Sequence, residues 1–97
     1  MKNEPAITKM VKEEIKFLHF PKEDVLFISD DQKIRMKSLN NAISLGNLDH
    51  QKVKIQFQDV EGEKQVETTI WGLTDKDVIL KQGTTIPIHR IIKVNLI

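Results

Sequence analysis

The sequence predicts an α+β chain in which two N-terminal helices precede a small, five-stranded, antiparallel β-barrel. Three observations carry this prediction. Apolar residues recur at spacings near three and four over residues 6–18 and, more loosely, over 30–45, as in helices that bury one face. From Lys52 onward the apolar period becomes two, which is typical of half-buried strands. Turn-forming residues then divide the second half of the chain into five short segments.

The first helix is expected over residues 6–18. Its apolar stripe consists of Ile7, Met10, Val11, Ile15 and Leu18. Pro5 suits the first turn of a helix, and Pro21 marks the latest point at which the helix can continue. A helix this short is marginal in water by itself, so its stripe is expected to pack on the barrel, on a second copy or on another partner.

The second helix is expected over residues 30–45, after a short apolar run at 24–28. That run fits either a buried strand or an extended connector, and we favour the connector. Ser29, followed three residues later by Gln32, has the form of a capping box with acidic residues in the first turn. Gly46 and the asparagine after it are a typical stop signal.

The five strands are expected between turns in the second half of the chain. The first, at 52–58, is followed by a hairpin turn at 59–63, where a glycine supplies the positive φ of a tight reversal. The second, at 65–71, is expected to bend at Gly72. The other three strands are predicted at 78–80, 85–88 and 92–96, with a 3₁₀ turn at 89–91. This order is that of an SH3-like or Sm-like barrel.

We therefore expect a helical arm at 1–49 and a barrel at 50–97, which together form one compact unit. The chain has 97 residues, which suits one domain and leaves no room for a second domain of enzyme size. Hydrophobic residues make up 39% and charged residues 30%, as in ordinary globular proteins.

Charge and cysteine content exclude several classes of function. The sequence has no cysteine, which excludes disulfides, thiolate nucleophiles and zinc ribbons. Fifteen basic and fourteen acidic residues leave a net charge of +1, which gives no strong electrostatic case for nucleic acid or membrane. The chain lacks a signal-peptide core and a span of about 20 apolar residues, so we expect a cytoplasmic protein.

The segment VETTIWGLTDKDVILKQGTTIPIHRIIKV, residues 66–94, resembles Sm-like and wider SH3-like barrels in its pattern. Nearly the whole chain also resembles a group of short, uncharacterised bacterial proteins in which a helical leader precedes this TTIW and IPIHRI pattern; that resemblance implies no function. In strand order alone the chain is similar to the small barrel inhibitor of the transcription terminator Rho, which binds protein.

The Sm-like resemblance implies edge-to-edge assembly into rings and RNA binding by two loops, which correspond here to 73–77 and 89–91. The match is partial. The first loop lacks the usual asparagine, and Arg90 is followed by Ile91 where the RNA-binding motif has glycine. Both departures weaken the implied RNA pocket.

No catalytic, cofactor or metal site is expected from the sequence. The histidines, His19, His50 and His89, are far apart and show no ligand spacing. The acidic residues between 59 and 63 lack the ordered spacing of a calcium loop and are better interpreted as a solvated hairpin. No serine lies in a nucleophile-elbow context. We therefore expect a protein that is not an enzyme.

The predicted interaction surface consists of Trp71, Asp75, Lys76, His89 and Arg90. Trp71 is the only tryptophan and, if its strand neighbours point inward, it points outward. We expect the N-terminal helices to cover it, with a role in an interface as the alternative. His89 and Arg90 are placed to contact a phosphate or an acidic partner, or else to bridge within the barrel.

Two functions remain open. The first is a non-catalytic binding or adaptor module that engages a partner protein or itself, since open strand edges favour pairing into oligomers. The alternative is weak binding of RNA or another single-stranded nucleic acid through Arg90, Lys76 and Lys81, as the Sm-like resemblance implies.

Overall fold

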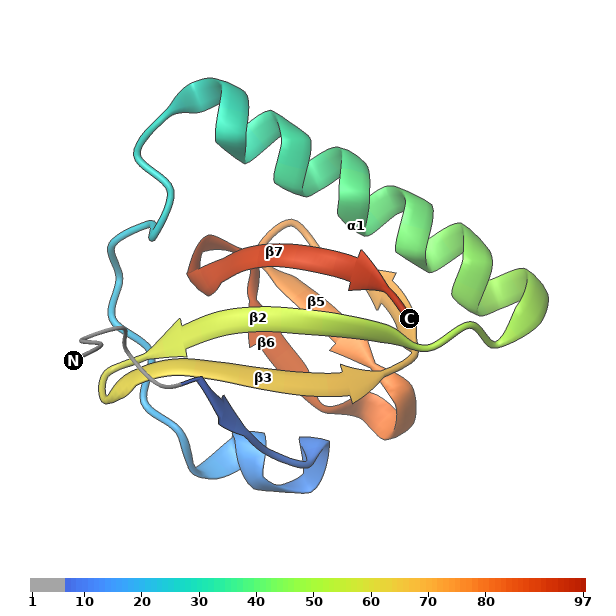
Figure 1. Cartoon of the computed structure of the whole chain (residues 1–97), viewed down its shortest axis with the longest axis horizontal. Coiled ribbons are helices and arrows are strands. Elements are labelled where there is room, and N and C mark those ends of the chain that lie inside the picture. The colour runs from blue at the N-terminus through green and yellow to red at the C-terminus, as the bar shows by residue number, and fades with distance from the viewer. Residues whose placement is uncertain (1–6) are drawn as a thin grey trace, which may run out of the picture.

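The computed structural model describes residues 7–97, which contain one α-helix and seven strands in two sheets (Figure 1). The N-terminal part consists of strand β1 (Thr8–Lys9), the 3₁₀ helix η1 (Lys12–Phe17) and the long helix α1 (Ser29–Asp49). Residues 18–28, here called the connector, join η1 to α1. The remaining elements are β2 (Val53–Asp59), β3 (Gly62–Thr68), β4 (Ile70–Leu73), β5 (Asp77–Leu80), η2 (Lys81–Gly83), β6 (Thr85–Pro87), η3 (Ile88–Arg90) and β7 (Ile91–Leu96).

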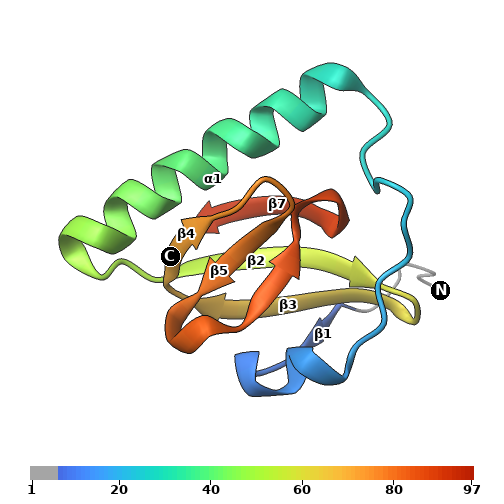
Figure 2. The same ribbon diagram turned by 180° about the vertical axis from the view of Figure 1, so that it is seen from behind.

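The two sheets share no strand. The first has the order β1-β3-β2-β7, in which β1 pairs parallel with β3 and the other pairs are antiparallel. The second is antiparallel and has the order β4-β5-β6. It lies behind the first sheet in Figure 1 and in front of it in Figure 2. The prediction of two N-terminal helices followed by a closed five-stranded SH3-like barrel is therefore wrong.

The predicted first helix is replaced by β1 and η1. Thr8 and Lys9 pair with Lys64 and Gln65, and the Met10 N–H donates to the Gln65 carbonyl at 2.9 Å. Pairing with the edge of β3 satisfies backbone groups there, whereas a short isolated helix gains little in water. Ile15 on η1 is buried in the core. The predicted start at residue 6 and the role of Pro5 lie outside the described residues.

The predicted second helix is present but is longer than expected. Ser29 is its first residue rather than its cap, and Ile28 stands at the N-cap without a side-chain hydrogen bond. Gln32 instead donates its side-chain amide to the Leu26 carbonyl at 2.7 Å. The helix passes through Gly46 and ends at Asp49, and His50 at the C-cap adopts a left-handed conformation with φ of 54°. The predicted stop at Gly46 is therefore wrong.

Gly46 lies inside the helix because α1 contacts the second sheet there. A Cβ on Gly46 would stand 2.5 Å from the Ile70 carbonyl oxygen and 3.0 Å from the Thr69 methyl group. Backbone cannot retreat from such a contact without moving a strand. Glycine is therefore required by tertiary packing, not by the end of the helix.

Replacing Gly46 by alanine is expected to lower the free energy of unfolding by about 1–2 kcal/mol, although alanine is the better helix former by about 1 kcal/mol. The added methyl group must displace either α1 or β4. Urea denaturation followed by circular dichroism measures the effect. Ser44→Ala, at an exposed site on the same helix, is the matched control and should change stability by less than about 0.5 kcal/mol. A stabilised Gly46→Ala protein would contradict the contact.

The strand pattern agrees with the sequence except at the second strand. β2 buries Val53, Ile55 and Phe57 on one face, as its period of two predicts. The expected long second strand is broken at Thr69 into β3 and β4, which join different sheets. β4 also carries a register shift between Ile70 and Gly72 where it pairs with β5. At this break the chain passes from the first sheet to the second. The predicted bend would instead have kept one continuous strand within a single barrel.

The core lies between the sheets and takes side chains from almost every element. Ile15 from η1 and Leu39 and Ala42 from α1 join the buried strand residues in one cluster. The strand and η3 members are Val53, Ile55, Phe57, Val66, Ile70, Val78, Leu80, Ile86, Ile88 and Ile91. The segments expected as arm and barrel thus share one core and form a single small α+β domain.

The N-terminal segments close the sides of this two-sheet core. α1 contacts both β7 and β4, which are end strands of the two sheets (Figures 1 and 2). On another side, η1 contacts β3 and β6. Covering free strand edges in this way blocks pairing with other chains. Within residues 7–97, no helix is both long and apolar enough to cross a membrane.

Candidate functional site

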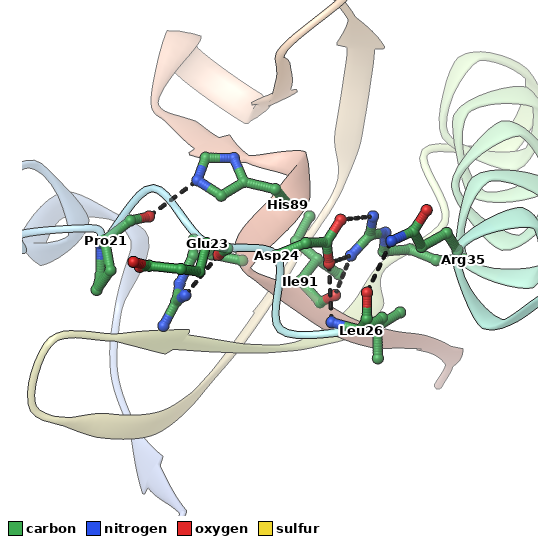
Figure 3. A network of polar contacts seen from close by, with 9 residues as sticks. Pro21, Glu23, Asp24, Leu26, Arg35, His89 and Ile91 are labelled. Carbon is green, nitrogen blue, oxygen red and sulfur yellow. Dashed lines mark hydrogen bonds and ion pairs between the residues drawn. The ribbon is translucent and has the colours of Figure 1, made fainter. Parts of the chain in front are cut away.

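His89 and Arg90 hold the connector against the sheets. The side chain of Arg90 is 6% exposed; its Nε donates to the Gln58 carbonyl at 2.9 Å and its Nη1 to the Glu23 carbonyl at 2.7 Å. His89 donates from Nε2 to the Pro21 carbonyl at 2.9 Å (Figure 3). The His89 carbonyl accepts from the Val25 N–H at 2.9 Å. These contacts bridge within the fold, so Arg90 is not free to bind a partner.

An ion pair continues this polar network at the start of α1. Arg35 Nη1 and Nη2 donate to the two carboxylate oxygens of Asp24 at 2.9 and 2.8 Å, and Nη1 also donates to the Ile91 carbonyl at 3.1 Å (Figure 3). The hydrogen bond from Arg35 lowers the pKa of Asp24 against the opposing effect of burial, and the Leu26 N–H and the charges of Arg35 and His89 add to the lowering. This pair stabilises the connector and offers no reactive group.

Sequence reasoning missed the Asp24–Arg35 pair because its partners come from an irregular connector and a helix eleven residues apart. One signal was present. Arg35 occupies the helical face that also buries Leu39, Ala42 and Gly46, and a charge on a buried face needs a partner.

Asp75, Lys76 and His89 lie together around a shallow hollow of about 380 Å³. The turn at 74–77, between β4 and β5, is held by Thr74, whose hydroxyl accepts from the N–H groups of Lys76 and Asp77 at 3.2 and 2.9 Å. The hollow mixes charges of both signs, because Asp75, Asp77, Lys76 and Arg35 all line it. It therefore presents no consistent charge to a ligand.

Trp71 belongs to a different site, which we call the Trp71 groove. The groove has a volume of about 580 Å³ and is lined by Gly46, Asn47, His50, Lys52, Thr69, Trp71 and Lys81. Trp71 remains 49% exposed, so the N-terminal segments do not cover it as expected. The predicted surface is thus divided between the groove, the hollow and the connector contacts.

Hydrogen bonds hold the walls of the groove together. The Thr69 hydroxyl donates to the His50 carbonyl at 3.3 Å, and the Lys81 N–H donates to the Thr69 carbonyl at 2.9 Å. His50 donates its own N–H to the Gly46 carbonyl at 3.1 Å. The end of α1, the break between β3 and β4, and η2 are thereby joined around Trp71.

The charge of the groove is of one sign. Lys52 and Lys81 are exposed, His50 lies between the helix end and Lys52, and none of the described residues that line the groove is acidic. Sequence reasoning selected Trp71 and Lys81 but missed His50 and Lys52. The helix predicted over 30–45 ends four residues before α1 does, so the sequence did not indicate that the end of the helix reaches Trp71.

The described residues offer no evident metal centre. Within residues 7–97, no group of three or more His, Asp or Glu side chains is placed to hold an ion. His50 lies at the groove and His89 on the connector contacts, while His19 contributes its carbonyl to the Val60 N–H.

Comparison of the chain with protein-family models, with curated proteins and with solved structures gave no match. The resemblance to short bacterial proteins with the TTIW and IPIHRI pattern therefore stays a prediction. The function has to be argued from the geometry and charge of the site itself.

Proposed function

We propose that this protein is a non-catalytic binding module that holds a partner protein in the Trp71 groove. The observation that carries the proposal is a half-exposed tryptophan, the only one in the chain, in a groove lined by cationic and neutral residues. Tryptophan is enriched among the residues that dominate protein interfaces, because a large ring gains much from burial by a partner.

The form of the groove supports this function. Its volume lies in the range typical of ligand pockets, about 300–1,000 Å³. Its backbone is already tied by the Thr69 and His50 hydrogen bonds, so little ordering has to accompany binding. We also propose a cytoplasmic location, with which a sequence that lacks cysteine is compatible.

Self-association by strand pairing has less support than a partner protein. α1 lies over β7 and β4, and Pro87 interrupts the donor groups of β6. Binding of single-stranded nucleic acid is the second candidate, because the Trp71 ring can stack on a base while Lys52 and Lys81 contact phosphate. Of the cations first assigned to that role, Arg90 is buried and Lys76 lies at the hollow.

Photocrosslinking in cells tests the proposal without knowledge of the partner. A benzophenone amino acid placed at Asn47, an exposed and uncharged residue of the groove lining, is expected to form a discrete covalent adduct. The same group at Val60, an exposed residue of the β2–β3 hairpin, is expected to form none. Adding Trp71→Ala should abolish the adduct at 47. Circular dichroism should show an unchanged fold, because Trp71 is half exposed.

Equal adducts from positions 47 and 60, or an adduct at 47 that survives Trp71→Ala, would contradict binding in the groove. Digestion of the adduct identifies its class. A protease-sensitive, nuclease-resistant adduct supports a partner protein, and a nuclease-sensitive adduct supports the second candidate.

A further inference from the structure

We infer that the Trp71 groove recognises a short, extended, acidic peptide segment in which carboxylates flank an apolar side chain. This inference rests on the proposed function and adds the chemistry of the ligand.

The first support is unmatched positive charge. The described ion pairs of the fold join Lys12 to Glu13, Arg35 to Asp24, and Lys64 to both Asp59 and Glu61. Within the part of the chain that the structure describes, no such pair involves Lys52 or Lys81.

The chain has nearly equal numbers of acidic and basic residues, so two free lysines with a histidine on one concave surface are a local excess. Asp49 is the acidic residue next to the groove in sequence, and it is not part of the lining. A ligand that carries carboxylates complements this charge.

The second support distinguishes a peptide from a nucleic acid. α1 ends at the groove, where the carbonyls of Leu45 and Gly46 accept from the N–H groups of Gln51 and His50. A helix leaves its last carbonyls without partners inside the helix, and this end carries a partial negative charge. The named carbonyls already have partners, but the partial negative charge of this helix end favours a ligand that places a neutral group beside it. A peptide can do this with an uncharged residue between its carboxylates, whereas a phosphodiester backbone repeats a negative charge at every unit.

The third support is Trp71 itself. β4 shifts register at this residue, which leaves the ring on the surface and half exposed beside the lysines. An apolar side chain of the ligand that covers the ring gains the burial that the fold does not provide. Carboxylates on either side of it reach Lys52, which precedes β2, and Lys81, which begins η2; both lysines line the same groove.

Fluorescence titration tests the inference directly, since Trp71 is the only tryptophan and reports on the groove. The probe is a blocked pentapeptide with two glutamates on each side of a leucine. It is expected to change the emission saturably, with an affinity that falls as salt is added. The same peptide with glutamines in place of glutamates should bind at least tenfold more weakly.

Variants locate the charge contacts. The double variant Lys52→Gln/Lys81→Gln is expected to weaken binding of the acidic peptide at least tenfold. Lys33→Gln/Lys93→Gln removes the same charge from exposed sites on α1 and β7 and is the matched control, with an expected change of less than twofold.

Three results would overturn the inference: equal binding of the glutamine peptide, tighter binding of a ten-nucleotide oligothymidylate than of the acidic peptide, or no response to the acidic peptide. None of them by itself removes the proposed function, because the crosslinking experiment reports occupancy of the groove by any ligand.

Discussion

Replacing Lys64 by methionine is expected to lower the free energy of unfolding by about 3–5 kcal/mol, the largest single effect that we predict. Lys64 Nζ lies 3.0 Å from Asp59 Oδ1, and the Asp59 side chain is only 1% exposed. Methionine keeps much of the length of lysine but removes its charge. The buried carboxylate is then left with only the N–H groups of Glu61 and Gly62, at 3.0 and 3.2 Å.

Urea denaturation followed by circular dichroism measures this loss. Lys93→Met makes the same replacement at an exposed site on β7 and should change stability by less than about 0.5 kcal/mol. Combining Lys64→Met with Asp59→Asn removes both charges and is expected to recover part of the loss. If Lys64→Met is no more destabilising than Lys93→Met, the pair does not hold the hairpin.

Replacing Arg35 by methionine is expected to cost about 2–3 kcal/mol at neutral pH. The change leaves Asp24 without its bidentate partner and the Ile91 carbonyl without one donor. The loss of stability should be smaller than that for a fully buried pair, about 3–5 kcal/mol, because the Asp24 side chain is still 27% exposed. Arg35 Nε is buried and has no hydrogen-bond partner among residues 7–97, which further reduces the net stabilisation by the native arrangement.

The cost of Arg35→Met should depend on pH. Arg35 lowers the pKa of Asp24 in the folded protein, so the contribution of the pair is fully present above the unfolded pKa of about 3.9. It disappears as the pH falls through the lowered folded pKa, where Asp24 takes up a proton. Denaturation curves between pH 7 and pH 3 should therefore show the wild type and the variant converging on acidification.

The double variant Asp24→Asn/Arg35→Met is the control for this pH dependence. It has no carboxylate at position 24. The difference in stability between the double variant and wild type should therefore also shrink at low pH. The difference in stability between the double variant and Arg35→Met should vanish at low pH. A pH-independent cost of Arg35→Met would show that the lost packing of Arg35, not its ion pair, destabilises the protein.

Much of the strand structure could be predicted from the sequence. The period of two in β2, the turn at Gly62 and the 3₁₀ turn before β7 depend on neighbours along the chain. The start of α1 was also close, because acidic residues in the first turn are a local signal. These features are recognisable because local backbone preferences and burial agree there.

The N-terminal segment and the end of α1 could not be predicted in the same way. The apolar spacing of residues 7–18 suits a helix, yet Thr8 and Lys9 pair with β3, whose edge is adjacent only in the folded chain. Gly46 has the properties of a helix stop, yet it serves a close approach to Ile70 twenty-four residues away. In both cases a contact distant in sequence outweighs the local preference.

The candidate site shows the same division. The sequence by itself determined that Trp71 points outward from its strand, that cysteine chemistry is excluded and that the charges nearly balance. Only the tertiary structure decided which cations stand beside Trp71. The extra turn of α1 brings His50 and Lys52 to Lys81, while packing turns Arg90 inward to bind the connector. The direction of a side chain along a strand is a local property, but the residues that surround the side chain depend on how distant elements pack.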